Sequence, residues 1–244
     1  MPLHLKNPHS ILAVLEARPQ DIYEIRLPDP VAGPWGRIRS SATEIGVRIS
    51  GRTRASRRQN RTGRARGAEA VVKERRAVPV QELFANAPPD GLWLALDRVQ
   101  DPHNVGAIFR TAAFFGVRGI LITRDRSAPL TDTVYDVASG GVEHVPFSFP
   151  ANLSRALDLA RTANVWILGA SEHADTGLDR IAADHRPWLL VVGNEERGLR
   201  RLTLDKCDAT CRIPSTGSVA SLNVSVAAGI FMQKLAGPPD APPS

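Results

Sequence analysis

Cysteine is scarce in this chain of 244 residues, which contains Cys207 and Cys211 and no others. The two form a CxxxC pair without a second pair or a histidine cluster nearby, so no metal site is expected. Isolated thiols of this kind are typical of a protein from a reducing compartment.

Long apolar runs are missing as well. No stretch approaches the roughly 20 apolar residues that span a membrane, and the first residues lack the apolar centre of a signal peptide. Hydrophobic residues nevertheless make up 43% of the chain, enough for the core of one large domain or two modest ones. A soluble, cytoplasmic protein without membrane contact is therefore expected.

Negative charge is deficient in the first third of the chain. Residues 1–90 hold 16 Lys and Arg against 9 Asp and Glu, whereas residues 91–244 hold 15 against 16. The net charge of +6 is thus confined to one end, which favours a polyanion-binding module joined to a more neutral one.

The positive charge is densest in "SGRTRASRRQNRTGRARG", residues 50–67, which shows no apolar period. A solvated, disordered run is one interpretation. An RNA-contacting loop is the preferred one, because guanidinium groups bind phosphates bidentately and stack on bases. The expected RNA contacts are Arg52, Arg54, Arg57, Arg58, Arg61 and Arg64.

The amino-terminal third reads as mixed α and β structure. "HSILAVLEA" (9–17) predicts a helix with Ser10 as its N-cap, and "DIYEIRL" (21–27) predicts a strand. "DPVAGPWGR" (29–37) indicates a loop, and 68–80 a returning strand. "FANAPPDG" (84–91) has the proline and glycine content of a linker.

Beyond residue 91 strands and helices alternate, which predicts an α/β domain with a mostly parallel sheet between helices. The tail "GPPDAPPS" (237–244) is expected to fray. The expected strands are 92–99, 119–123, 164–171, 187–195 and 209–215, and the expected helices are 104–116, 152–162 and 222–236.

Three unusual loops follow predicted strands, where open parallel sheets bind ligands. In "DRVQDPHNVGAIFR" (97–110), Asp101 or His103 is expected to cap the coming helix, with Asn104 in its first turn. Arg110 stands among apolar neighbours, so it is either a solvent-facing helix residue or a cation with a partner or a function.

The second loop is "VVGNEERGLRR" (191–201), where Gly193 lets the backbone approach a ligand and Gly198 can adopt a positive φ. It contains neither GxGxxG nor a P-loop lysine. The third is "IPSTGSVASLNVSVAAGIFM" (213–232), rich in small side chains, with a tight turn at Gly217 and Ser218. So little side-chain bulk predicts a ligand held against the backbone.

Three segments in order, "DPHNVGAIFRTAAFFG", "VVGNEERGL" and "IPSTGSVASLNVSVAAGI", resemble the SpoU (TrmH-like) branch of the SPOUT RNA methyltransferases. The resemblance covers roughly residues 92–236. It implies an α/β fold whose C-terminal segment makes a deep trefoil knot, a topology that periodicity alone cannot suggest. Residues 1–85 resemble the L30e-like substrate domain of ribosomal RNA members, although the arginine-rich segment departs from that pattern.

The resemblance implies that S-adenosylmethionine binds in the knot, its adenine recognised largely by backbone atoms. No metal is expected. The matching cofactor positions are Gly193, Asn194, Ile213, Ser218, Leu222 and Asn223.

The implied reaction transfers a methyl group to a ribose 2′-hydroxyl, with Arg110 in the central role. A guanidinium has a pKa above about 12 and is not an obvious base, so polarising the hydroxyl or binding a phosphate are alternatives for Arg110. Asn104, Glu195, Ser221 and Asn223 would complete the site. Glu196 stands where many relatives carry glycine, and it either assists a cationic sulfonium or faces solvent.

The resemblance also implies a homodimer packed through the knot helices. The expected division is an RNA-binding domain (1–85), a linker (86–91), a catalytic domain (92–237) and a disordered tail (238–244). A guanosine of 23S ribosomal RNA is the preferred target. A transfer RNA guanosine enzyme, a resistance enzyme for ribosomal RNA adenosine and a non-catalytic RNA-binding protein are the alternatives.

Overall fold

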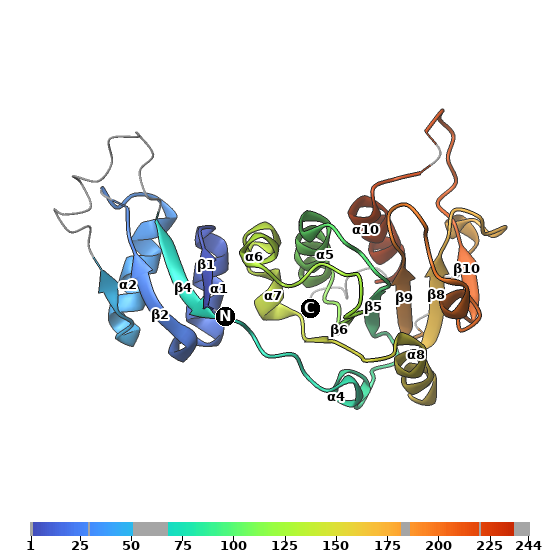
Figure 1. The fold of residues 1–244 in the computed structure, drawn as a ribbon, viewed down its shortest axis with the longest axis horizontal. Helices are drawn as coiled ribbons and strands as arrows, with labels where there is room; N and C mark the ends of the chain where they lie inside the picture. The colour runs from blue at the N-terminus through green and yellow to red at the C-terminus, as the bar shows by residue number, and fades with distance from the viewer. Residues whose placement is uncertain (1, 29, 51–67, 182–185, 220, 237–244) are drawn as a thin grey trace, which may run out of the picture.

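The computed structural model describes residues 2–28, 30–50, 68–181, 186–219 and 221–236. They form two α/β units, each with its own sheet, that lie side by side along the longest axis of the molecule (Figure 1). The arginine-rich segment 51–67 and the six arginines expected to contact RNA lie outside the described residues.

The larger sheet has six strands in the order β10-β8-β9-β5-β6-β7, and every neighbouring pair is parallel. Its three middle strands, β9, β5 and β6, are buried along their whole length. The prediction of a mostly parallel α/β sheet is therefore confirmed. The strands are β5 (Leu92–Leu96), β6 (Gly119–Ile122), β7 (Phe147–Ser148), β8 (Trp166–Ala170), β9 (Trp188–Val192) and β10 (Ala209–Cys211).

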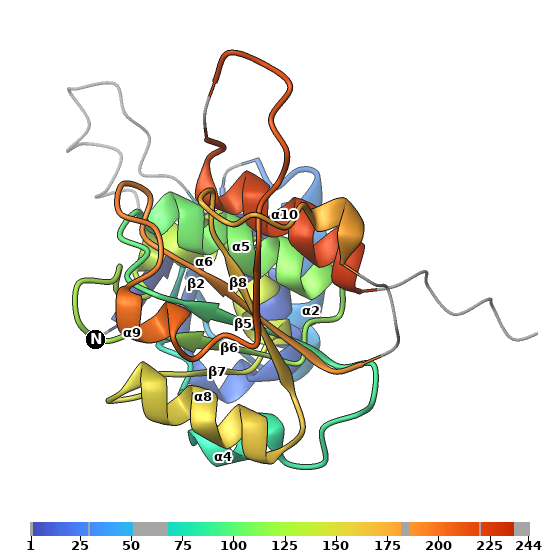
Figure 2. The same cartoon turned by 90° about the vertical axis from the view of Figure 1, so that its right-hand side faces the viewer.

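Helices cover both faces of this sheet (Figure 2). On one face lie α5 (Pro102–Phe114), α6 (Asp132–Ala138), α7 (Gly141–His144) and α10 (Val224–Leu235). On the other lie α4 (Val80–Phe84), α8 (Leu153–Thr162) and α9 (Arg201–Leu204), where Leu83 and Leu157 share a buried cluster with Trp93. The pattern did not predict α6, α7 or β7. The knotted passage of the C-terminal segment stays a prediction.

The smaller sheet is mixed, with the order β1-β4-β2-β3. Its strands are β1 (Pro2–Leu5), β2 (Ile22–Arg26), β3 (Ile49–Ser50) and β4 (Glu69–Lys73), and its helices are α1 (Pro8–Ala17) and α2 (Pro34–Ile45). Two local predictions are wrong. Asn7 rather than Ser10 caps α1, because Pro8 occupies the first helical position, and the Ser10 hydroxyl instead donates to the Tyr135 carbonyl at 2.7 Å. The expected loop at 29–37 becomes helical from Pro34, a residue suited to the first turn.

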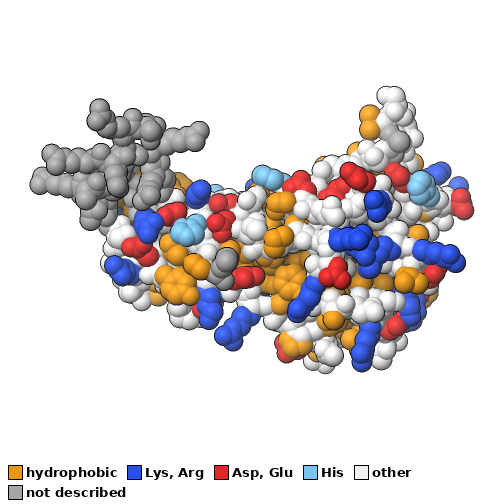
Figure 3. Space-filling view, in the orientation of Figure 1, with side chains coloured by type: hydrophobic (Ala, Val, Ile, Leu, Met, Phe, Trp, Pro, Cys, Tyr) orange, Lys and Arg blue, Asp and Glu red, His pale blue; other side chains and the backbone are white. Residues whose placement is uncertain are grey.

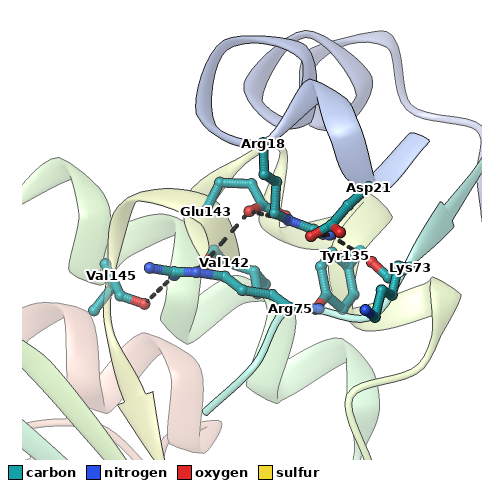
Figure 4. A network of polar contacts seen from close by, with 8 residues as sticks. All are labelled: Arg18, Asp21, Lys73, Arg75, Tyr135, Val142, Glu143 and Val145. Carbon is teal, nitrogen blue, oxygen red and sulfur yellow. Dashed lines mark hydrogen bonds and ion pairs between the residues drawn. The ribbon is translucent and has the colours of Figure 1, made fainter. Parts of the chain in front are cut away.

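The two units share one hydrophobic core, in which Leu5 and Leu15 of the first unit cluster with Phe109 and Tyr135 of the second. A buried ion pair crosses the same boundary (Figure 4). The Arg18 guanidinium donates to both Glu143 carboxylate oxygens, each at 2.8 Å, and the Glu143 side chain is 1% exposed.

Arg75 completes this network from the segment that connects the two sheets. Its guanidinium donates to the carbonyl oxygens of Val142 and Val145, and its backbone N–H donates to the Tyr135 hydroxyl at 3.0 Å. Burial lowers the pKa of Arg75 and raises that of Tyr135. The chain therefore crosses between the sheets along a bonded segment, and the division into domains at residues 85–91 stays a prediction.

Candidate active site

A cavity of about 320 Å³ opens at the carboxyl ends of β8, β9 and β10. The loop after each of these strands contributes to it, beginning at Ser171, Gly193 and Arg212. This is the edge at which parallel sheets bind ligands. The apolar part of the wall includes Val192, Leu199, Leu204, Ile213, Leu222, Val224 and Phe231.

The loop after β9 is a tight turn closed on itself. The N–H groups of Asn194 and Gly198 each donate to the other residue's carbonyl, at 3.1 and 2.9 Å. Gly198 has a φ of 62°, as its glycine predicts. A Cβ on Gly193 would lie 2.3 Å from the Gly198 carbonyl carbon. Gly193 therefore permits a close approach of the chain to itself, a reason for this glycine that the sequence did not reveal.

A chain of side-chain hydrogen bonds joins the three segments singled out in the sequence. Asn223 Nδ2 donates to Asn104 Oδ1 at 2.9 Å, and Asn104 Nδ2 donates to Glu195 Oε1 at 3.0 Å. The Asn194 amide donates to Glu195 Oε2 at 3.3 Å and to the Arg98 carbonyl oxygen at 3.1 Å. These bonds hold the loops after β5 and β9 against the start of α10.

Two helix starts fix the positions of Asn104 and Asn223 in this series of hydrogen bonds. Asp101 caps α5 by accepting from the His103 N–H at 2.8 Å, which puts Asn104 in the first turn. Asn223 caps α10 by accepting from the N–H groups of Ser225 and Val226. Each asparagine is therefore fixed by the geometry of a helix start.

A buried carboxylate anchors the β9 loop from below. The Asp97 side chain is fully buried, and it accepts from Arg200 Nε at 3.0 Å and from the Thr203 hydroxyl at 2.7 Å. Because Asp97 directly follows β5, this contact fixes the chain after the turn to the centre of the sheet. The sequence did not predict roles for Asp97 and Arg200, and its only signal was a carboxylate at the end of a strand.

The structure brings together some of the predicted site residues and leaves others apart. Gly193, Asn194, Glu195, Ile213, Ser221 and Leu222 line the cavity. Asn104 and Asn223 lie behind it, bonded to Glu195 directly or through each other. Ser218 is exposed and does not line the cavity.

Arg110 lies on α5, is exposed, and is not part of the cavity wall. Within the described part of the chain, its side chain has no hydrogen bond or ion pair. The side chains that donate to Glu195 are those of Asn104 and Asn194, and not that of Arg110. The predicted roles of these residues therefore stay predictions.

Charged groups of both signs surround the cavity. Glu172 and His173, which follow β8, were not predicted, although the end of a predicted strand marked their position. Glu195 and Glu196 face them from the β9 loop, together with Arg197. Arg212 also lines the cavity, so three carboxylates and two guanidinium groups border it.

The two thiols are poor nucleophiles. Cys211 is buried at the cavity wall, and burial raises its pKa to about 12. Burial likewise raises the pKa of Cys207 to about 12, and its thiol donates to the Thr203 carbonyl at 3.3 Å. Both thiols are therefore protonated at neutral pH.

Over the residues that the structure describes, no group of three or more His, Cys, Asp or Glu side chains is placed to hold a metal ion. No helix in the same ranges combines the length and apolar character needed to cross a membrane.

The fold and the cavity define an α/β protein with a ligand-sized cavity at the carboxyl edge of a parallel sheet. A model of the SpoU rRNA Methylase family matches residues 91–233. The chain belongs to this family.

Two curated relatives share substantial sequence. The chain is 42% identical over 172 residues to the 23S rRNA (guanosine-2'-O-)-methyltransferase RlmB of Nitrosomonas europaea, an alignment that covers 70% of this chain and 66% of that protein. It is thus aligned with slightly less than two thirds of that relative. The RlmB of Coxiella burnetii is 35% identical over 240 residues, with 96% of this chain and 95% of that protein covered.

A solved structure shares the fold across both units. The SpoU methyltransferase AviRb from Streptomyces viridochromogenes, in complex with the cofactor AdoMet, superimposes with a TM-score of 0.76. The superposition covers 96% of this chain and 89% of that chain at 23% identity.

Proposed function

We propose that this chain is an S-adenosylmethionine-dependent RNA 2′-O-ribose methyltransferase that modifies a guanosine of 23S ribosomal RNA. The names of the relatives from Nitrosomonas and Coxiella support this target. The observation that carries the proposal is the hydrogen-bonded chain Asn223–Asn104–Glu195, because it joins the three motif loops around one cavity.

The cavity suits S-adenosylmethionine in size and lining. Its volume of about 320 Å³ is at the lower end of the range for small-molecule sites. Ile213 and Leu222 offer apolar walls for a purine, while Gly193 and its neighbours present backbone groups. Glu172, Glu195 and Glu196 place carboxylates where a cationic ligand gains from them.

When bound, S-adenosylmethionine supplies a methyl group made electrophilic by its sulfonium centre. In this proposal Gly193, Asn194, Ile213 and Leu222 hold the adenosine, and Ser221 and Ser218 border the entrance. Asn104 and Asn223 act by fixing Glu195 and the start of α10. The catalytic residues can then meet the ribose in a repeatable geometry.

Arg110 is proposed to act on the RNA. Its exposed side chain, without a described partner, is available to a phosphate or to the ribose hydroxyl. Because a guanidinium remains protonated at neutral pH, it stabilises developing negative charge rather than accepting a proton.

The proposal includes a homodimer formed through the exposed apolar side chains of α5 and α10. Phe114 is 83% exposed, Val226 51% and Ile230 37%. The two helices pack together beneath this face, where Gly229 of α10 lies against Thr111 of α5. Exposed apolar side chains on adjacent helices favour burial against a second copy.

The proposal assigns residues 1–85 to RNA binding, with the arginine-rich segment 50–67 as a contact, and residues 92–237 to catalysis. It places the protein in the cytoplasm, with its ribosomal RNA substrate. In this arrangement the buried contact between Arg18 and Glu143 keeps the RNA-binding unit close to the catalytic one.

The decisive experiment maps 2′-O-methyl groups in RNA from cells with and without the gene. The expected result is the loss of one guanosine methylation from 23S ribosomal RNA, restored by the purified chain with S-adenosylmethionine. A lost site in transfer RNA, or at an adenosine, would favour those alternative enzymes. No lost site, together with no binding of S-adenosylhomocysteine in calorimetry, would favour a non-catalytic RNA-binding protein.

A further inference from the structure

Two arginines in the loops after β5 and β6 have an unusual backbone conformation. Among the described residues other than glycine, positive φ angles occur at Asn86, Arg98, Arg126, Ser139 and Asn164. Asparagine tolerates this left-handed region, and Ser139 ends a helix there. Arg98 and Arg126, with φ angles of 65° and 57°, have neither explanation.

Both arginines lie at the same edge of the sheet, after the neighbouring parallel strands β5 and β6. Two hydrogen bonds tie their loops together, and a third, between Thr123 and Ser127, closes the β6 loop on itself. The Arg98 N–H donates to the Thr123 hydroxyl at 2.9 Å, the hydroxyls of Thr123 and Ser127 are 2.6 Å apart, and the Ala128 N–H donates to the Val99 carbonyl at 2.9 Å.

The loop after β5 adjoins the candidate active site. The Arg98 carbonyl accepts from the Asn194 amide, and Asn194 lines the cavity. Arg98 is therefore held from one side by the β6 loop and from the other by the β9 loop. These contacts use its backbone alone, so a glycine could make each of them with less steric cost.

The side chains have no structural task to explain their presence. In the described residues, neither the Arg98 nor the Arg126 guanidinium has a hydrogen bond or ion pair. Arg126 and its neighbour Arg124 are exposed, and Arg98 is partly so. Figure 3 shows Lys and Arg side chains on both halves of this face, several of them over the half that contains β5, β8 and β9.

Nearby carboxylates are mostly engaged elsewhere. Asp97 is bonded to Arg200 and Thr203, Asp101 caps α5, and Glu195 accepts from Asn104. Asp125, which stands between Arg124 and Arg126 in the sequence, is exposed. Strained residues that persist without a structural need cluster at functional sites, and guanidinium groups are suited to bidentate phosphate contacts.

We propose that Arg98 and Arg126 form a phosphate-binding site for the backbone of the substrate RNA, on the catalytic unit and separate from the arginine-rich segment. This inference rests on the proposed function and adds a contact that positions the RNA beside the cavity. Phosphate contacts fix register on a nucleic acid without reading its sequence.

The test replaces both arginines with glycine, which removes the side chains and relieves the backbone. The probe is ribosomal RNA from cells that lack the gene. We expect R98G/R126G to bind it about tenfold more weakly, with the slope of log affinity against log salt reduced by about 1.4, since each single-strand phosphate contact contributes about 0.7. The KM for RNA should rise correspondingly, while the affinity for S-adenosylhomocysteine and the unfolding temperature stay equal or increase.

The matched control is R118S/N164G, which removes one exposed arginine and one left-handed residue at the opposite edge of the sheet. Its RNA affinity and salt slope should equal those of the native chain, and the single variant R98G should differ from it.

Unchanged RNA affinity and salt slope in R98G/R126G, with an active native enzyme, would overturn the inference while leaving the proposed function intact. A fall in unfolding temperature and in cofactor affinity would overturn it too, because the arginines would then be structural. If the native chain neither binds nor methylates RNA, the proposed function itself fails.

Discussion

Replacing Asn104 with alanine tests whether the hydrogen-bonded chain behind the cavity sets the positions of its loops. Asn104 is 7% exposed, donates to Glu195 at 3.0 Å and accepts from Asn223 at 2.9 Å. The bond to the carboxylate stabilises by about 1.5–3 kcal/mol, and the amide–amide bond by about 1 kcal/mol.

Two corrections reduce this sum. Glu195 and Asn223 are exposed, so water replaces the lost partner, and the lower end of each range applies. Alanine also gains about 0.5 kcal/mol of helix propensity over asparagine. The net loss is about 2 kcal/mol, which corresponds to a factor of about 30 if it falls entirely on ligand binding.

Calorimetry with S-adenosylhomocysteine and urea unfolding measure how this loss divides between ligand binding and stability. We expect a dissociation constant about fivefold larger, which corresponds to about 1 kcal/mol, and a fall of about 1 kcal/mol in the free energy of unfolding. Thr162→Ala on α8 is the control, because its exposed hydroxyl donates only within its own helix, to the Asp158 carbonyl. If Asn104→Ala matches this control in both measurements, the chain of bonds does not organise the site.

Further predictions concern catalysis, the unit boundary and the thiols. Arg110→Ala should abolish methyl transfer while cofactor affinity stays within a few-fold, so normal transfer by that variant would exclude the assigned role. Glu143→Gln should lower the free energy of unfolding by about 3 kcal/mol, because it removes the buried carboxylate that accepts from Arg18 and leaves that guanidinium only Asp21, at 3.3 Å, as a counter-ion. Lys206→Met, which removes an exposed ion pair with Asp158, should cost less than about 1 kcal/mol in the same urea titration. Since burial raises the pKa of both thiols to about 12, the unfolded chain loses these protons first, near pH 8.5. Stability should therefore fall as the pH rises from about 8.5 towards 12, and folded protein at pH 8 should react slowly with a thiol reagent; rapid reaction would contradict this burial.

The strands of the catalytic unit were predictable because their signals are local. β5, β6 and β9 are short apolar runs buried on both faces, and Asp101 caps α5 as its position before Pro102 suggests. The segment between β6 and α8 was not predicted, because α6, α7 and β7 are short and show no clear period. Pro34 was interpreted as a loop residue, although it begins a helix.

Part of the candidate site was visible in the sequence, but its connections were not. Small residues at 213–223 and the glycine turn after β9 predicted a backbone-lined pocket, and both segments line the cavity. The bond between Asn223 and Asn104 joins residues 119 positions apart, and no local pattern encodes such a contact. The same holds for Asp97 and Thr203, which meet only because β5 and β9 are neighbours in the sheet.

The continuous core between the two sheets has a practical consequence for cutting the chain. A fragment that starts after residue 85 would keep Glu143 but lose both Arg18 and Arg75. The Glu143 carboxylate, whose side chain is 1% exposed, would then have neither of these counter-ions. It would also uncover the faces of α6 and α7 on which α1 packs. An excised catalytic fragment should therefore aggregate and fold poorly. In evolution, the first unit could be removed or exchanged only together with substitutions that make this surface polar.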